Sequence, residues 1–226
     1  KVILVTSGGS GKPIDEMELN MALFEKECVD VIGVIVNKVI SSKYERIKKI
    51  LSLGLKKRGI DMLGVIPYTS SLSMPTIQHI IEETDIKMVS KTTGMQNKVR
   101  NILIGAMSPH DALDYIEDGS LLIMPGDRED LIMTALSMHL LGKQHKQNSI
   151  SGIILTGGIM PHPKIMSLIE SARIPVLFSR EHTYITASKI HDLAIKIRPE
   201  DKEKALIVKR LIKRYVDVNK ILEKIK

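Results

Sequence analysis

The chain has 226 residues, of which 43% are hydrophobic and 26% charged, a balance that is typical of a globular protein with its own core. Its single cysteine, Cys28, excludes an internal disulfide, and the helical pattern around it favours a buried thiol over a reactive one. No apolar run approaches the ~18 residues of a membrane span, and the start lacks a signal-like apolar segment. We therefore expect a soluble, cytoplasmic protein with no membrane partner.

The formal net charge of +7 is concentrated at the carboxyl end of the chain. Residues 196–226 hold eleven Lys and Arg against five Asp and Glu, a surplus of about six positive charges. Nucleic-acid binding by base stacking would need aromatic side chains among these cations, and Tyr215 alone is present. The pattern therefore favours the solvated face of a helix, and we do not expect a nucleic-acid partner.

The first 72 residues alternate strands and helices. Apolar runs predict strands, and amphipathic segments between them predict helices. The expected strands are 1–5, 31–36 and 62–66, and the expected helices are 14–27 and 41–58. Strand–helix–strand order of this kind requires a parallel sheet with right-handed crossovers. Three strands make a small sheet, so we expect 1–72 to be part of a larger domain with further strands upstream of Lys1.

A turn-rich stretch, YTSSLSMP at 68–75, marks the expected domain boundary. We predict a connecting helix in residues 73–84 and a second, smaller α/β domain at 85–198. Its expected strands are 87–89, 99–104, 121–124, 150–155 and 174–178, and its expected helices begin near 109, 131, 163 and 183. The remaining residues, 199–226, are expected to form a separate basic C-terminal helix. The predicted fold class is therefore α/β in both parts.

The segment TSGGSGKP at 6–13 follows the first strand and resembles a phosphate-binding P-loop. That loop requires the pattern G-x-x-x-x-G-K-[ST], in which glycines admit the phosphates and a hydroxyl binds Mg²⁺. Here Thr6 occupies the first glycine position, and Pro13, which has no hydroxyl, follows Lys12. We therefore reject a Walker A motif in this segment.

A weaker nucleotide site remains as a hypothesis at the same ends of the first two strands. Gly8 and Gly9 would allow a ligand to approach the backbone closely. Asn37 and Lys38 follow the second strand and are similar to the base-reading Asn-Lys pair of P-loop proteins. An ordinary turn at 37–38 is the alternative interpretation, and it is favoured because the phosphate loop itself is missing.

The chain is organised around residues 118–142, DGSLLIMPGDREDLIMTALSMHLLG. An apolar run is closed by Pro125 and Gly126, after which apolar residues recur at helical spacing, which predicts strand, turn and helix. In parallel α/β units, ligands bind at the carboxyl end of such a strand, against the free N–H groups of the helix. A second strand ending in glycines, IILTGG, lies at 153–158. Both strand ends can face one crevice, so we predict the ligand site there.

The predicted ligand is a small anion. Arg128 would offer it a planar fork of donors, and the glycines would let the backbone come close. The alternatives are an arginine that pairs with Glu129 or a neighbour at the helix start, and a plain left-handed turn at the glycines. Glu181 and Tyr184 would line the same crevice or act as cap and core. The candidate ligand-binding residues are Gly126, Asp127, Arg128, Thr156, Gly157 and Gly158.

Catalytic and metal sites are not expected. The seven histidines show none of the spacings that are typical of zinc ligands, and no second cysteine accompanies Cys28. No serine lies in a G-x-S-x-G turn, which excludes the nucleophile elbow of serine hydrolases. No residue of the chain is therefore assigned a catalytic role.

Several blocks of the sequence resemble known domain families. GGSGKPIDEMELNMALFEKECVDVIGVIVNKV, followed by GIDMLGVIP, resembles the later part of the dethiobiotin-synthetase-like P-loop domain at the N-terminus of long phosphate acetyltransferases. GSLLIMPGDREDLIMTAL, together with residues 152–199, resembles the DRTGG domain that follows it there. These blocks cover nearly all of the chain, although the name-giving motif is split between 127–128 and 156–158. The resemblance implies a Walker A strand upstream of Lys1 and an acetyltransferase domain downstream.

The resemblance implies a regulatory or ligand-sensing protein that binds a small anionic metabolite or nucleotide at its strand ends. It would act as a homo-oligomer or with an enzyme of acyl metabolism, and would not itself be an enzyme. The alternative is an ATP-dependent ligase or synthetase of the dethiobiotin synthetase or cobyrinic acid diamide synthase type. In that case the Walker A half lies outside this chain, and ATP or another nucleotide is the cofactor. A third hypothesis is a purely structural oligomerisation module.

Overall fold

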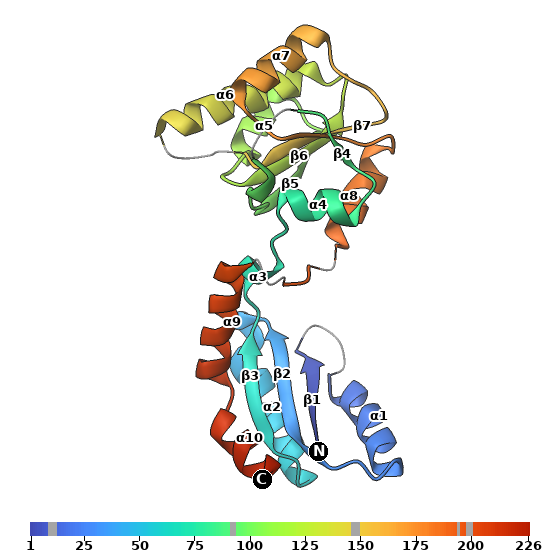
Figure 1. Ribbon diagram of the computed structural model, residues 1–226, viewed down its shortest axis with the longest axis vertical. Helices are drawn as coiled ribbons and strands as arrows, with labels where there is room; N and C mark the ends of the chain where they lie inside the picture. The colour runs from blue at the N-terminus through green and yellow to red at the C-terminus, as the bar shows by residue number, and fades with distance from the viewer. Residues whose placement is uncertain (9–12, 91–93, 146–149, 194, 198–200) are drawn as a thin grey trace. The chain divides into compact units, whose positions relative to one another are not determined.

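The computed structural model describes residues 1–8, 13–90, 94–145, 150–193, 195–197 and 201–226. The chain forms two compact units, one made of Lys1–Leu72 with Ile197–Lys226, the other of Ser73–Lys196 (Figure 1). Each unit contains a largely or wholly parallel sheet with helices, which confirms the predicted α/β class. Among the described helices, none is long and apolar enough to cross a lipid bilayer.

The first unit is built on a three-stranded sheet in the order β1-β2-β3, with all strands parallel, as the sequence predicts. Its elements are β1 (Val2–Ser7), α1 (Pro13–Lys26), β2 (Val31–Val39), a 3₁₀ turn (Ser41–Lys43), α2 (Tyr44–Lys57) and β3 (Met62–Pro67). The apolar face of α2, through Leu51 and Leu55, packs on the sheet residues Val34, Val36 and Val65. Burial of these side chains is the main term that holds the unit together.

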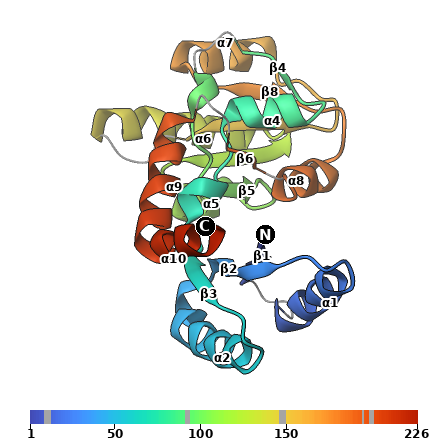
Figure 2. The same ribbon diagram turned by 60° about the horizontal axis from the view of Figure 1, so that its bottom comes forward.

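The C-terminal segment belongs to the first unit. It forms two helices, α9 (Lys202–Tyr215) and α10 (Val218–Ile225), rather than the single helix expected at 199–226. Between them Val216 forms an antiparallel bridge with Gly64, and Asp217 N donates to Leu63 O at 2.8 Å. Both helices therefore lie along β3 (Figures 1 and 2). The segment closes the edge of the sheet.

The thiol of Cys28 is exposed, so the expectation of a buried thiol is wrong. The residue lies in the turn between α1 and β2 with φ of 52°, in the left-handed region. Helical periodicity placed it on the face of α1, but the helix ends at Lys26, and the turn directs the side chain to solvent. The exposure of the thiol is therefore decided by the helix end.

The second unit is a five-stranded sheet in the order β4-β8-β7-β6-β5, with β4 antiparallel to β8 and the other pairs parallel. A short helix α3 (Ser70–Ser73) precedes it, and a 3₁₀ turn lies at Gly94–Gln96. The strands are β4 (Lys87–Met88), β5 (Asn101–Ile104), β6 (Ser120–Pro125), β7 (Gly152–Thr156) and β8 (Val176–Phe178). The helices are α4 (Ile77–Glu83), α5 (Pro109–Tyr115), α6 (Glu129–His145), α7 (Pro163–Ala172) and α8 (Thr183–His191).

Helices cover both faces of this sheet. Helices α5, α6 and α7 lie on one face and α4 and α8 on the other (Figure 1). Alternate strand residues point to opposite sides: Leu122 and Met124 pack with α5, α6 and α7, while Leu121 and Ile123 pack with α4 and α8. Residues 120–124 of β6 are buried throughout. A central parallel strand reads as a continuous apolar run for this reason. Because β5 to β8 are parallel, their carboxyl ends lie on the same side of the sheet, where the loops leading into the helices lie.

An acid-sensitive contact holds α10. Asp61 accepts from Lys220 and Lys224, at 2.6 and 2.5 Å, and these hydrogen bonds lower the pKa of its carboxyl group below its ordinary value. A lowered pKa contributes stability that is complete above the unfolded-state pKa and is lost as the pH falls through the folded-state pKa. The contact therefore contributes fully at neutral pH, begins to weaken as the pH falls below the ordinary carboxyl pKa of about 4, and is lost below the lowered pKa of Asp61.

We expect Asp61→Asn to lower the free energy of unfolding of the first unit by about 0.5–1 kcal/mol at pH 7, because the pairs are one-third exposed and screened by solvent. Urea denaturation at pH 7 and pH 3 measures the effect. The difference between variant and wild type should shrink at pH 3. An equal difference at both pH values would contradict a role for the ionised carboxylate.

Candidate functional site

The two corners predicted to form the ligand site, the turn at Gly126 after β6 and the loop that begins with Gly157 and Gly158 after β7, lie in direct contact. Gly126 follows β6, and a Cβ atom placed on it would lie 1.9 Å from the carbonyl oxygen of Ile159, in the loop after β7. Glu129 Oε1, at the start of α6, accepts from the backbone N–H of His162 at 2.6 Å. The two loops therefore pack on each other, backbone to backbone, and Gly126 is required for this close approach.

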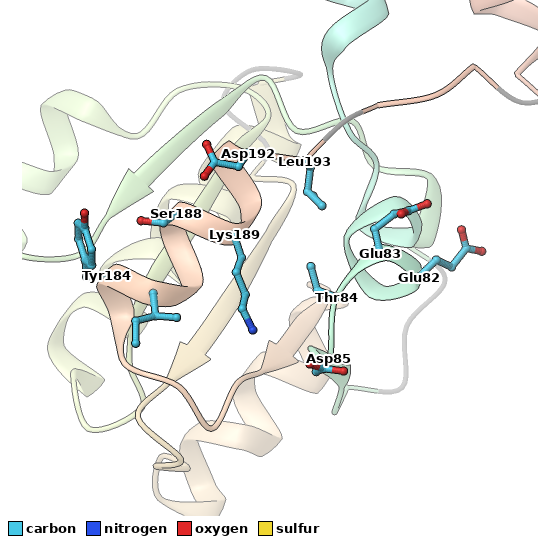
Figure 3. A pocket seen from close by; sticks show the side chains of 10 residues that line it. Glu82, Glu83, Thr84, Asp85, Tyr184, Ser188, Lys189, Asp192 and Leu193 are labelled. Atoms are coloured by element: carbon cyan, nitrogen blue, oxygen red, sulfur yellow. The ribbon is translucent and has the colours of Figure 1, made fainter.

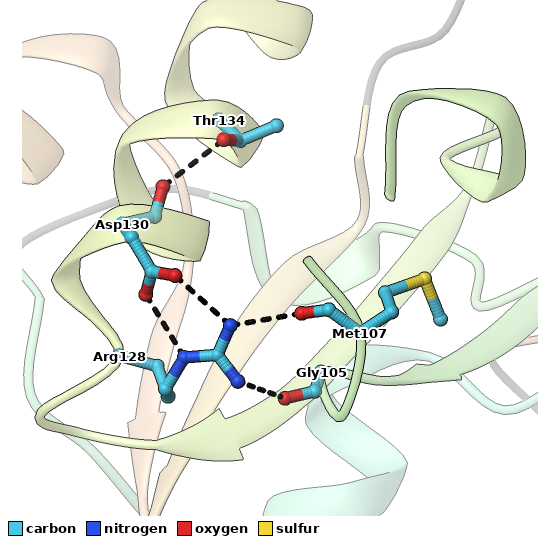
Figure 4. Close-up of polar contacts among 5 residues, drawn as sticks. All are labelled: Gly105, Met107, Arg128, Asp130 and Thr134. Carbon is cyan, nitrogen blue, oxygen red and sulfur yellow. Dashed lines mark hydrogen bonds and ion pairs between the residues drawn. The ribbon is translucent and has the colours of Figure 1, made fainter. Parts of the chain in front are cut away.

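Arg128 holds a third loop to the same corner (Figure 4). Its Nε and Nη2 donate to the two carboxylate oxygens of Asp130, each at 2.9 Å. Nη1 and Nη2 also donate to the carbonyl oxygens of Gly105 and Met107, at 3.2 and 2.8 Å, in the connection between β5 and α5. These contacts use four of the five N–H donors of the guanidinium group. Arg128 therefore connects the start of α6 to the end of β5.

Arg128 and Asp130 each stabilise the charged form of the other. The hydrogen bond to Asp130 raises the pKa of Arg128, and the nearby Asp127 adds to the effect. In turn, the hydrogen bond from Arg128 lowers the pKa of the Asp130 carboxyl group. Both groups stay charged across the physiological range. The neighbour with which Arg128 pairs is thus Asp130 rather than Glu129, while the side chain of Asp127 is exposed.

Thr156, Gly157 and Gly158 join the end of β7 to the segment after β8. Thr156 is fully buried, and its hydroxyl group lies 2.7 Å from that of Thr183, at the start of α8. Gly157 N donates to Glu181 O at 2.8 Å, and Gly158 N donates to Ser179 O at 3.1 Å. Both glycines have φ near +70°, a conformation that favours glycine. Their amides therefore fix the chain at 179–181.

A hollow of about 460 Å³ opens at the carboxyl end of β8. Three cations line it from different elements: Lys87 from β4, Arg180 from the loop after β8, and Lys189 from α8. Asp85 and Glu181 also line it, and Lys189 Nζ pairs with Glu181 Oε1 at 2.9 Å. This hydrogen bond to Glu181, assisted by the charge of Asp85, raises the pKa of Lys189. The arrangement can accept an anion.

Sequence reasoning identified only part of this hollow. Glu181, suggested for the crevice at 126–128 and 156–158, lines this hollow at the end of β8, and Tyr184 is 79% exposed on α8. Lys87, Arg180 and Lys189 were missed, because they are isolated basic residues far apart in the sequence. A usable signal was present: the apolar run before Ser179 is also a parallel strand, and the residues that follow such strands line ligand sites.

The candidate residues of the first unit lie together, but they contact one another. Gly8 N donates to Asn37 O at 2.6 Å, and a Cβ on Gly8 would lie 2.3 Å from a methyl group of Val39. Asn37 Oδ1 accepts from the N–H of Lys38, which has φ of 60°. Asn37 and Lys38 therefore lie within β2, which extends to Val39, and neither the predicted strand end at Val36 nor the alternative turn at 37–38 is found. Gly9, the fourth candidate, lies outside the described residues. Within the parts of the chain that the structure describes, no group of three or more His, Cys, Asp or Glu is arranged to hold a metal ion.

We expect Arg128→Ala to lower the free energy of unfolding of the second unit by about 1–3 kcal/mol, because it leaves two carbonyls and a carboxylate without their donor. Thermal denaturation without any ligand measures the loss. Arg128→Lys keeps the charge but lacks the planar fork, so it should recover only part of the stability. An unchanged melting temperature for Arg128→Ala would contradict the structural role.

We also expect Gly126→Ala to cost about 2 kcal/mol or more, because the added methyl group meets the backbone of Ile159, which cannot rotate away. Gly54→Ala is the matched control: Gly54 lies inside α2 with no atom within 4 Å of the added Cβ, so its replacement should stabilise by up to ~1 kcal/mol. Urea denaturation of both variants tests the contrast. Equal effects would show that the corner tolerates a side chain.

Each unit matches a known domain family. Residues 1–76 match the AAA domain family, and residues 79–193 match the DRTGG domain family. Phosphate acetyltransferases are similar over nearly the whole chain: that of Nitratidesulfovibrio vulgaris is 29% identical over 97% of it, and that of Synechocystis sp. is 31% identical over 98%. The chain spans about a third of their lengths, 32% and 31% respectively.

A solved structure is also similar: the CBS and DRTGG domains of the regulatory region of Clostridium perfringens pyrophosphatase, complexed with its activator diadenosine tetraphosphate. The identity is 13% and the TM-score 0.43, over 83% of this chain and 72% of that one. The resemblance seen in the sequence to the N-terminal region of phosphate acetyltransferases is confirmed by the family matches and relatives. The match to the DRTGG domain family covers half of the residues of this chain, and the chain therefore belongs to that family.

Proposed function

We propose that this protein is a regulatory, ligand-sensing module that binds a small anionic metabolite or nucleotide at the strand ends of its second unit. The observation that carries the proposal is the hollow at the end of β8, where Lys87, Arg180 and Lys189 converge. Cations brought together from three separate elements require the folded unit, so a ligand that bridges them binds only the native state. Such a ligand stabilises the unit by mass action.

The two predicted corners hold the segment that lines this site in place. Gly157 and Gly158 hold residues 179–181 through two backbone hydrogen bonds, so they position Arg180 beside the hollow. In turn, Gly126 packs on the loop after β7, and Arg128 with Asp127 beside it lies at the start of α6. In this proposal Thr156, Gly157 and Gly158 hold the start of α8 and the segment 179–181, which borders the ligand. The turn at Gly126, Asp127 and Arg128 packs on the loop after β7 and so supports that arrangement.

Exchange of ion-pair partners would make the site responsive. Without an anion, Lys189 pairs with Glu181, in a contact about 40% exposed and therefore weak because solvent screens it. A phosphate or carboxylate group, held also by Arg180 and Lys87, competes with Glu181 for Lys189. Binding then changes the contacts of α8 and β4 at once. Such a change can bias the packing of another copy of the chain or of an acyl-metabolism enzyme, and the similar proteins are phosphate acetyltransferases.

A nucleotide-dependent synthetase is the second candidate. The match of residues 1–76 to the AAA domain family favours it. The described contacts of Gly8 and Asn37 join the end of β1 to β2 and provide no phosphate cradle by themselves. The coding sequence upstream of Lys1 distinguishes the two candidates, because a G-x-x-x-x-G-K-[ST] loop there would support nucleotide hydrolysis.

Thermal denaturation of the full chain with pyrophosphate, acetyl phosphate and ATP tests the sensor proposal. At least one compound should raise the melting temperature by several degrees, since saturation at 100 times the dissociation constant contributes about 2.7 kcal/mol. Arg180→Ala should reduce this shift, and Lys164→Ala, which removes an exposed cation from α7 on the other face of the sheet, should not. No shift with any compound, or an equal response of Arg180→Ala, would overturn the proposal.

A further inference from the structure

A second hollow, of about 690 Å³, adjoins the first one. It lies between the end of α4 and the exposed side of α8, and the two hollows share Asp85 and Lys189. In Figure 3, Lys189 extends from α8, and Leu193 from the segment just after it, toward Thr84 and the residues at the end of α4. Each hollow falls within the range of roughly 300–1,000 Å³ that is typical of small-molecule sites. Together they form one elongated site, with Lys189 at the junction.

The two parts of this site differ in their chemistry. The first is lined by three cations beside Asp85 and Glu181. The second is lined by four carboxylates and by the apolar side chains of Ile185 and Leu193; the carboxylates are those of Glu82, Glu83, Asp85 and Asp192. Carboxylates accept hydrogen bonds and repel other anions. Apolar side chains between them favour a flat or apolar body. The site therefore suits a ligand with a phosphate at one end and uncharged hydrogen-bond donors at the other.

We propose that the ligand is a nucleoside phosphate, with its phosphates beside Lys87, Arg180 and Lys189 and its nucleoside between α4 and α8. This inference rests on the proposed function and adds the ligand class to it. Ribose hydroxyl groups and an exocyclic amine of the base are uncharged donors, which Glu83 and Asp192 accept without charge repulsion. The base lies against Leu193 and Ile185.

Other small ligands match only one part. Inorganic polyphosphate and acyl phosphates occupy the cationic part but leave the second hollow without a partner. A polyamine would pair with Glu83 and Asp192, but Lys87 and Arg180 repel it from the first. The carboxylates also fix the orientation of a nucleotide, because they keep its phosphates on the far side of Lys189. The order of charges along the site thus selects both the ligand class and its direction.

Calorimetric titration of the full chain with ATP, tripolyphosphate and spermidine tests the inference. We expect ATP to bind at least tenfold more tightly than tripolyphosphate, because a hydrogen bond to a charged acceptor is worth roughly 10–100-fold in affinity. Asp192→Asn and Glu83→Gln should each weaken ATP binding and leave tripolyphosphate binding unchanged. Both residues are exposed, so these isosteric changes should not disturb folding. Asp114→Asn, on α5 at the opposite face of the sheet, is the matched control and should bind ATP as wild type does.

The outcomes distinguish the nucleotide assignment from the proposed function as an anion sensor. If tripolyphosphate binds as tightly as ATP and both carboxamide variants are silent, the nucleotide assignment is overturned while an anion sensor remains. If spermidine binds and the anions do not, the second hollow is a cation site and the assignment is equally wrong. If none of the three ligands binds, the proposed function itself fails.

Discussion

The second unit depends on the contact between the turn after β6 and the loop after β7. Gly126 has no side chain, so the carbonyl group of Ile159 lies where a Cβ would otherwise be. Arg128 then connects this turn to the loop after β5, and Gly157 and Gly158 connect the loop after β7 to the segment after β8. The ends of four parallel strands are thereby linked in series by backbone packing and hydrogen bonds.

This linkage explains where a ligand site remains open. A donor that already serves the chain must lose that partner before it can serve a ligand, and an unpaired buried group is costly. The polar groups at the ends of β6 and β7 are engaged by the protein, as Arg128 and Gly157 illustrate. At the end of β8, by contrast, cations line a hollow, and the ion pair of Lys189 is exposed to solvent. Rigid corners on one side and an exchangeable ion pair on the other are suitable for a sensor.

The first unit shows a related use of the chain. Its sheet is extended by residues from the far end of the sequence, through the bridge between Gly64 and Val216 and the ion pairs of Asp61. Composition alone would assign the surplus of positive charge at the carboxyl end to a solvated helix. Part of this charge instead holds α10 to Asp61, which lies just before β3. Lys220 and Lys224 therefore have a structural partner within the chain.

The sequence by itself determined the class and order of the elements. Apolar runs separated by helical periodicity favour a mainly parallel α/β arrangement, although the short β4 is antiparallel to β8, and the Asp-Arg and Thr-Gly-Gly segments indicated two strand ends that can face each other. The tertiary structure alone decided which donors stay available, since Arg128 contacts carbonyl groups 21 and 23 residues away. It also decided that Lys87, Arg180 and Lys189 share one hollow and that Asp61 meets the last helix. Local patterns predict periodicity within an element, whereas the partners of a side chain depend on packing between residues that are distant in the chain.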